Sequence, residues 1–136
     1  MKISVIIPTF NREKHLKNCL SSLLIQTKKP HEILIIDNSD NYYAKKVVNI
    51  FEEQFKLQNI SLYYFKNSIN SGAIARNLGV SKAKGDLIAF LDDDVLLDLN
   101  YYEEIEKVFV EYPDALGVHG YNKLLDNTYQ KIKKNF

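Results

Sequence analysis

The sequence is poor in the features that mark several common classes of protein. It contains one cysteine, Cys19, among 136 residues, so an internal disulfide is excluded. Its 18 basic and 17 acidic residues leave a formal net charge of +1, which gives no reason to expect nucleic-acid binding or steering toward a membrane. No apolar run approaches a membrane span, and Ile3 to Ile7 is too short for the apolar part of a signal peptide. We therefore expect a cytoplasmic domain. Association with a membrane would require a longer parent chain or a partner.

The single cysteine lies inside an apolar run from Leu16 to Ile25. This position suits a small buried hydrophobic residue better than a reactive thiol. We expect Cys19 to be part of the core.

Short apolar runs alternate with stretches of helical period along most of the chain. The runs that predict buried parallel strands are Ile3 to Ile7, Glu32 to Ile36, Ile60 to Tyr64 and Leu87 to Leu91. The stretches that predict helices are Glu13 to Ile25, Tyr42 to Phe55, Ala73 to Lys82 and Tyr101 to Tyr112. This alternation predicts a single α/β domain with a doubly wound, mainly parallel sheet flanked by helices.

Several signals refine the boundaries of this domain. Asn11 or Asn41 is placed to cap a following helix. Residues Ala115 to Tyr121 predict a fifth strand, interrupted by two glycines. We expect one domain over residues 1–121, followed over 122–136 by a polar tail or the start of a further part.

Polar residues directly follow three of the predicted strands. They are Pro8 to Arg12, Asp37 to Asp40, and Asp92 to Asp94. In an open α/β sheet these loops meet outside the carboxyl ends of the strands, where ligands bind. A dinucleotide oxidoreductase would need a glycine-rich turn after the first strand, and a P-loop hydrolase would need Gly-Lys-Ser/Thr; the sequence has neither.

Three consecutive aspartates, Asp92, Asp93 and Asp94, are the most informative motif. Their charges would repel one another unless a cation were shared among them. Carboxylate oxygens suit Mg²⁺ or Mn²⁺, with substrate phosphates completing the coordination. The alternative is a solvated acidic turn that caps the helix near Tyr101.

Other candidate ligand contacts lie in the loops after the second and third strands. Asp37 is placed to accept hydrogen bonds from a ribose or from a base with a ring N–H, or else to form a turn with Asn38 and Ser39. Gly72, at a helix start, allows a ligand to approach the backbone. Arg76 is placed to contact a base or a phosphate, or else to form a surface ion pair, and the same holds for Arg12 near the start of the first helix.

These motifs together resemble the family 2 glycosyltransferases, which have the GT-A fold. The resemblance rests on four segments in order: Ser4 to Arg12, Glu32 to Ser39, Asn70 to Gly79, and Gly85 to Asp94. It covers roughly residues 3 to 121. It implies a GT-A-type (Rossmann-like) fold truncated at the C-terminus.

The resemblance also implies a set of site residues. Asp92 and Asp94 would be the DXD motif, with Asp94 the main metal ligand and Asp92 close to the ribose and the metal. The implied nucleotide-sugar-binding residues are Pro8, Thr9, Phe10, Arg12, Asp37, Asn38, Gly72, Arg76, Asp92 and Asp93.

The implied function is transfer of a sugar from a nucleoside-diphosphate sugar, with a UDP-sugar favoured, in polysaccharide or glycoconjugate synthesis. The reaction would be metal-dependent, with Mn²⁺ or Mg²⁺, and would invert the anomeric carbon. The acceptor is unknown, and no residue is assigned as the general base. The alternative is a non-catalytic nucleotide- and metal-binding fragment or module without an acceptor half. Because a missing half would leave apolar surface exposed, we also expect weak self-association or reduced stability.

Overall fold

The computed structural model describes residues 1–121 of the chain, in which strands and helices alternate. The elements are β1 (Ile3–Thr9), α1 (Glu13–Leu24), β2 (Glu32–Asp37), α2 (Tyr43–Leu57), β3 (Ser61–Lys66), α3 (Gly72–Lys82), β4 (Leu87–Phe90) and α4 (Tyr101–Glu111). The predicted α/β order is confirmed. The predicted tail over 122–136 lies outside the described residues.

The four strands form one parallel sheet in the order β3-β2-β1-β4. Its two central strands, β1 and β2, are buried along almost their whole length. This burial explains their continuous apolar composition, because each of them is covered by helices on both faces.

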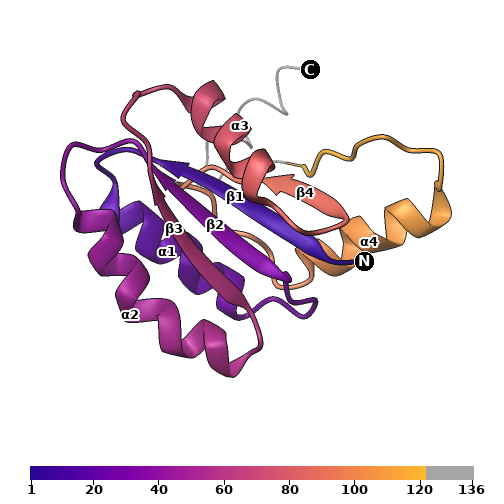
Figure 1. The fold of residues 1–136 in the computed structure, drawn as a ribbon. Coiled ribbons are helices and arrows are strands. Elements are labelled where there is room, and N and C mark those ends of the chain that lie inside the picture. The colour runs from indigo at the N-terminus through magenta and orange to yellow at the C-terminus, as the bar shows by residue number, and fades with distance from the viewer. Residues whose placement is uncertain (122–136) are drawn as a thin grey trace, which may run out of the picture.

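Helices cover both faces of the sheet, but unequally (Figure 1). The larger core joins α1, α2 and Tyr102 of α4 to one face of β1 and β2. The smaller core lies under α3, where Ala75 meets Ile6, Leu34 and Ile36. The sheet is therefore doubly wound, as predicted.

The packing of α3 on the sheet depends on a glycine. A Cβ atom at Gly79 would lie 2.4 Å from Cγ2 of the fully buried Ile6. Gly79 therefore lets α3 approach β1 more closely than any other residue would allow.

Neither residue predicted to cap a helix occupies the N-cap position. The side chain of Asn41 accepts a hydrogen bond from the backbone N–H of Tyr43 at the start of α2, but the N-cap of α2 is Tyr42, without a side-chain hydrogen bond. Asn11 does not cap α1: the N-cap position is Arg12, without a side-chain hydrogen bond. Asn11 instead has a left-handed backbone (φ 52°) and turns the chain between β1 and α1.

The prediction of a fifth strand over Ala115 to Tyr121 is wrong. This segment has no strand structure, and Leu116 is fully exposed. A Cβ atom at Gly117 would meet no neighbouring atom. The segment pairs with no strand of the sheet among the described residues, and Gly117 and Gly120 favour irregular backbone.

Part of the sheet surface on the α3 side is open to solvent. Ile88 and Phe90 of the edge strand β4 are 38% and 54% exposed. Their side chains share one face because residues two apart in a strand point the same way.

The single cysteine is a core residue, as predicted. Cys19 has no exposed surface, and its Sγ lies 3.7 Å from the carbonyl oxygen of Asp92. Burial, with a smaller contribution from the aspartates at 92–94, raises the pKa of its thiol to about 12.

We expect Cys19 of the folded chain not to react with a thiol reagent at about pH 8, because thiolate is the reactive form and the side chain is shielded. Absorbance of released thionitrobenzoate measures this directly, since the chain has no other thiol. The same sample in urea is the control and should react with one equivalent. Rapid, stoichiometric labelling of the folded protein would contradict the assignment.

Candidate functional site

The loops that follow the four strands meet at the carboxyl edge of the sheet. They form a pocket of about 260 Å³. It is lined by Pro8, Thr9, Phe10, Arg12, Asn38, Asn70, Gly72, Arg76, Asp92, Asp93 and Asp94. The structure thus brings together every residue predicted to bind nucleotide or metal except Asp37.

Asn70 is a lining residue that the sequence reasoning did not select. It lies just before α3, two positions ahead of Gly72. Its proximity to a helix N-terminus, where ligands are often bound, is the signal that would have found it.

The middle aspartate of the triplet differs from its neighbours. Asp93 is buried, and its carboxylate accepts a hydrogen bond of 2.8 Å from the Thr9 hydroxyl. Nη1 of Arg12 lies 3.4 Å from the other oxygen of this carboxylate. Asp93 therefore joins the loop after β4 to the end of β1 and forms the base of the pocket.

Two arginines pair with the aspartate triplet. Arg12 Nη1 lies 3.1 Å from a carboxylate oxygen of Asp94, and Arg76 Nη2 lies 2.7 Å from one of Asp92. The repulsion among the three carboxylates is therefore reduced by arginines and not only by a cation, as the sequence argument expected. For Arg76, the ion-pair alternative is the arrangement observed. Of the acidic-turn alternative only the turn is present, at Asp93 and Asp94. The aspartates do not cap α4, whose N-cap is Asn100, without a side-chain hydrogen bond.

The outer two carboxylates have the chemistry that a divalent metal requires. Asp92 and Asp94 both line the pocket, and their side chains are 63% and 47% exposed. Among residues 1–121, no group of three or more His, Cys, Asp or Glu side chains is placed to hold a metal ion. Two carboxylates fit a Mg²⁺ or Mn²⁺ ion only if water and substrate phosphates supply the other ligands, a common arrangement for Mg²⁺.

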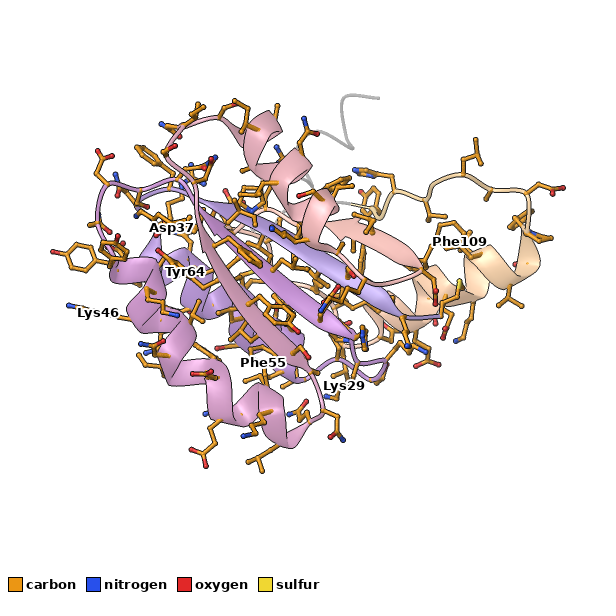
Figure 2. The ribbon with its side chains drawn as sticks, in the orientation of Figure 1. Lys29, Asp37, Lys46, Phe55, Tyr64 and Phe109 are labelled. Carbon is orange, nitrogen blue, oxygen red and sulfur yellow. The ribbon has the colours of Figure 1, made fainter. Side chains whose placement is uncertain are left out.

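Asp37 does not line the pocket, and its side chain has no exposed surface. Its carboxylate accepts hydrogen bonds from the Ser39 N–H (2.9 Å) and the Tyr64 hydroxyl (2.6 Å), and Lys66 Nζ lies 3.3 Å away. Figure 2 shows Asp37 and Tyr64 close together near the pocket end of the sheet. The predicted turn with Ser39 is present, and no open carboxylate faces a ligand in this arrangement.

The environment of Asp37 also sets its ionisation. Burial raises the pKa of this carboxyl, but the hydrogen bonds from Ser39, Tyr64 and Lys66 outweigh burial and hold the pKa below its ordinary value. Asp37 is therefore a charged, internally paired group at neutral pH.

A parallel α/β sheet with carboxylates and arginines gathered at its carboxyl edge is a nucleotide-binding type of α/β domain. Residues 4–135 match the sequence profile of Glycosyl transferase family 2. The chain belongs to this family, and the predicted GT-A-type fold is confirmed.

Individual relatives agree with this assignment. The chain is 36% identical to an uncharacterized glycosyltransferase of Rickettsia felis and 31% identical to glycosyltransferase GlyA of Streptococcus pneumoniae. Each alignment covers 98% of this chain and 20% of the relative, so the chain spans about a fifth of their length. The structure of S. aureus TarS in complex with UDP-GlcNAc matches with a TM-score of 0.71 and 26% identity, over 91% of this chain and 37% of that one.

Among residues 1–121, no helix is both long enough and apolar enough to cross a membrane.

Proposed function

We propose that this chain is the donor-binding part of a glycosyltransferase that uses a nucleoside-diphosphate sugar, with a UDP-sugar favoured. The observation that carries the proposal is the pocket at the carboxyl edge of the sheet, which brings together Asp92, Asp94, Arg12 and Arg76. The UDP-GlcNAc bound to S. aureus TarS, a structure 26% identical to this chain, supports the choice of nucleotide.

The pocket offers groups for the charged part of such a donor. The guanidinium groups of Arg12 and Arg76 are half exposed or nearly so and have the planar donor geometry that binds phosphate oxygens. Phe10 presents a partly exposed ring, which can pack on a sugar or a base. A Cβ atom at Gly72 would lie 3.0 Å from Nη1 of Arg76, so the missing side chain leaves room for the Arg76 guanidinium at the start of α3.

A divalent ion, Mn²⁺ or Mg²⁺, would be held by Asp92 and Asp94. It would stabilise the negative charge that develops on the departing nucleoside diphosphate. The proposed reaction is an inverting displacement at the anomeric carbon by an acceptor hydroxyl.

The acceptor-binding half is proposed to lie in the rest of the protein. Residues 1–121 would bind the donor, and 122–136 would begin the part that continues beyond it. The exposed side chains of Ile88 and Phe90 on β4 are a surface for that part to cover, and weak self-association of the chain by itself remains a prediction.

The proposal is tested by titrating the chain with UDP by calorimetry, with and without Mn²⁺. We expect binding that requires the metal and that weakens about 100-fold in Asp94→Ala, or about 2.8 kcal/mol at 1.4 kcal/mol per factor of ten. Glu53→Ala, an exposed acidic residue on α2, is the matched control and should bind UDP normally.

Failure of UDP and every other nucleoside diphosphate to bind would overturn the proposal. UDP binding that is equally strong without metal and in Asp94→Ala would contradict the proposed metal site and leave only the nucleotide site. The alternative of a non-catalytic binding module is separated from a transferase by assaying sugar transfer in the full-length parent protein.

A further inference from the structure

The side chain of Asn38 lies at the end of β2, under the pocket. Asn38 is only 7% exposed, yet it lines the pocket. Its backbone N–H donates to the carbonyl oxygen of Thr9 at 2.9 Å, which fixes the residue against β1. Its side-chain oxygen, Oδ1, accepts a hydrogen bond of 2.7 Å from Nδ2 of Asn67.

The orientation of Asn67 is in turn fixed by a backbone carbonyl. Asn67 Nδ2 also donates to the carbonyl oxygen of Ile69 at 2.8 Å. A carbonyl oxygen only accepts hydrogen bonds, so the NH₂ end of Asn67 must face it. The backbone N–H of Asn67 donates to the carbonyl oxygen of Asp37 at 2.9 Å, and the residue is largely buried.

This chain of contacts determines which end of the Asn38 amide faces the pocket. Because the NH₂ group of Asn67 needs an acceptor, Asn38 must turn Oδ1 toward it, and Nδ2 points away. Asn38 Nδ2 has no hydrogen-bond partner among residues 1–121. It is also not one of the fully buried side-chain atoms without a partner in this part of the chain, where that description applies to Gln58 Oε1. Asn38 Nδ2 therefore reaches the pocket surface with both of its N–H donors free.

In the empty pocket water accepts from these two donors, and a ligand that displaces this water must offer an acceptor in its place, because an unpaired donor is costly. The sheet order places β2 on one side of β1 and β4, which carries the aspartates, on the other. Asn38 therefore lies on the opposite side of β1 from the carboxylates that would hold the metal and the diphosphate, so the part of a bound UDP left for Asn38 to contact is the nucleoside.

We infer that Asn38 Nδ2 donates to a carbonyl or hydroxyl oxygen of the bound nucleoside, and that Asn67 is the positioning residue that holds Asn38 in this orientation. The inference rests on the proposed function and deepens it. It assigns Asn67, outside the pocket, a role in binding the nucleotide.

The first test uses the unaltered protein. In an NMR titration of ¹⁵N-labelled chain with UDP and Mg²⁺, we expect the side-chain NH₂ signals of Asn38 to shift on binding, together with the backbone signal of Gly72. Asn38→Asp assigns the Asn38 signals by their absence. If UDP shifts Gly72 but leaves the Asn38 NH₂ group unchanged, the inference is wrong and the proposed function stands. If no signal shifts, both are wrong.

The second test asks whether Asn67 acts through Asn38. Asn38→Ala and Asn67→Ala are each expected to weaken UDP binding about tenfold, the effect of one lost hydrogen bond. The double variant should bind about as weakly as either single variant, because the two residues serve one contact. Asn67→Asp, which replaces the donor with an acceptor of the same size, should also weaken binding by turning Asn38.

Additive losses in the double variant, or unchanged UDP binding by Asn67→Ala, would overturn the positioning role. Asn18→Ala, at an exposed position on α1, is the control for removal of an asparagine side chain and should bind UDP normally. The ¹⁵N backbone spectrum of each variant separates loss of the contact from loss of the fold.

Discussion

Replacement of Asp37 by alanine is expected to lower the free energy of unfolding by about 3 kcal/mol, the size typical of breaking a buried charged pair. The side chain of Asp37 has no exposed surface. Its removal leaves the Tyr64 hydroxyl and the Ser39 N–H without an acceptor, while the Lys66 ammonium loses its carboxylate and keeps the Asn41 carbonyl oxygen. The loss comes from these unpaired groups more than from the missing carboxylate itself.

Urea denaturation of the wild-type chain and of the variant measures this difference. Asp40→Ala, three positions along and exposed, is the matched control and should change stability by less than about 0.5 kcal/mol. A loss below about 1 kcal/mol for Asp37→Ala would show that water replaces the carboxylate, and would contradict the buried arrangement.

The contribution of Asp37 is also expected to depend on pH. Because its pKa is lower in the folded state than in the unfolded state, its stabilisation is fully present above the unfolded value of about 3.9. It is lost as the pH falls through the folded pKa. The stability difference between wild type and Asp37→Ala should therefore be constant from about pH 5 to 7 and shrink below about pH 4.

A second large effect is expected at Gly79, where α3 meets β1. Gly79→Val should lower the free energy of unfolding by about 3 kcal/mol, at the upper end of what overpacking a core usually costs. A Cβ atom there lies 2.4 Å from Cγ2 and 3.0 Å from Cδ1 of Ile6. Ile6 is fully buried in the sheet, so it has no free space into which to move.

Thermal or urea unfolding checks this prediction, and the chain contains a matched control. Gly117→Val places the same side chain where a Cβ atom meets nothing, so its effect on stability should be small. A stability of Gly79→Val within about 0.5 kcal/mol of wild type would mean that α3 shifts freely on the sheet. Gly79→Val combined with Ile6→Ala should recover part of the loss, since the contact that causes it is removed.

The strands, the helices and the location of the pocket were predictable from the sequence because each depends on local patterns and one topological rule. Continuous apolar runs such as Ile3 to Ile7 are typical of central parallel strands. Once the sheet is parallel, its carboxyl ends lie at one edge, so the residues after Ile7, Ile36 and Leu91 had to meet.

What the sequence did not predict depends on contacts between residues distant along the chain. The burial of Asp37 is set by Tyr64 and Lys66 on the neighbouring strand β3, and pairing of an acid with a distant tyrosine has no local signature. An ion pair was an alternative for Arg12, but its partner Asp94 lies in a loop far along the sequence and was not predicted. The predicted strand over Ala115 to Tyr121 failed because apolar composition does not supply a partner surface.

The sheet order has a consequence for how this chain acquires its structure during synthesis. β1 is made first but lies inside the sheet, and its pairing of Ile3 with Leu87 and of Ile6 with Phe90 waits for β4. A nascent chain that ends after α3 would hold β1 with one hydrogen-bonding edge bare, the kind of edge that pairs with other chains. Residues up to Phe90 must therefore leave the ribosome before β1, the first of these four strands, is protected on both sides.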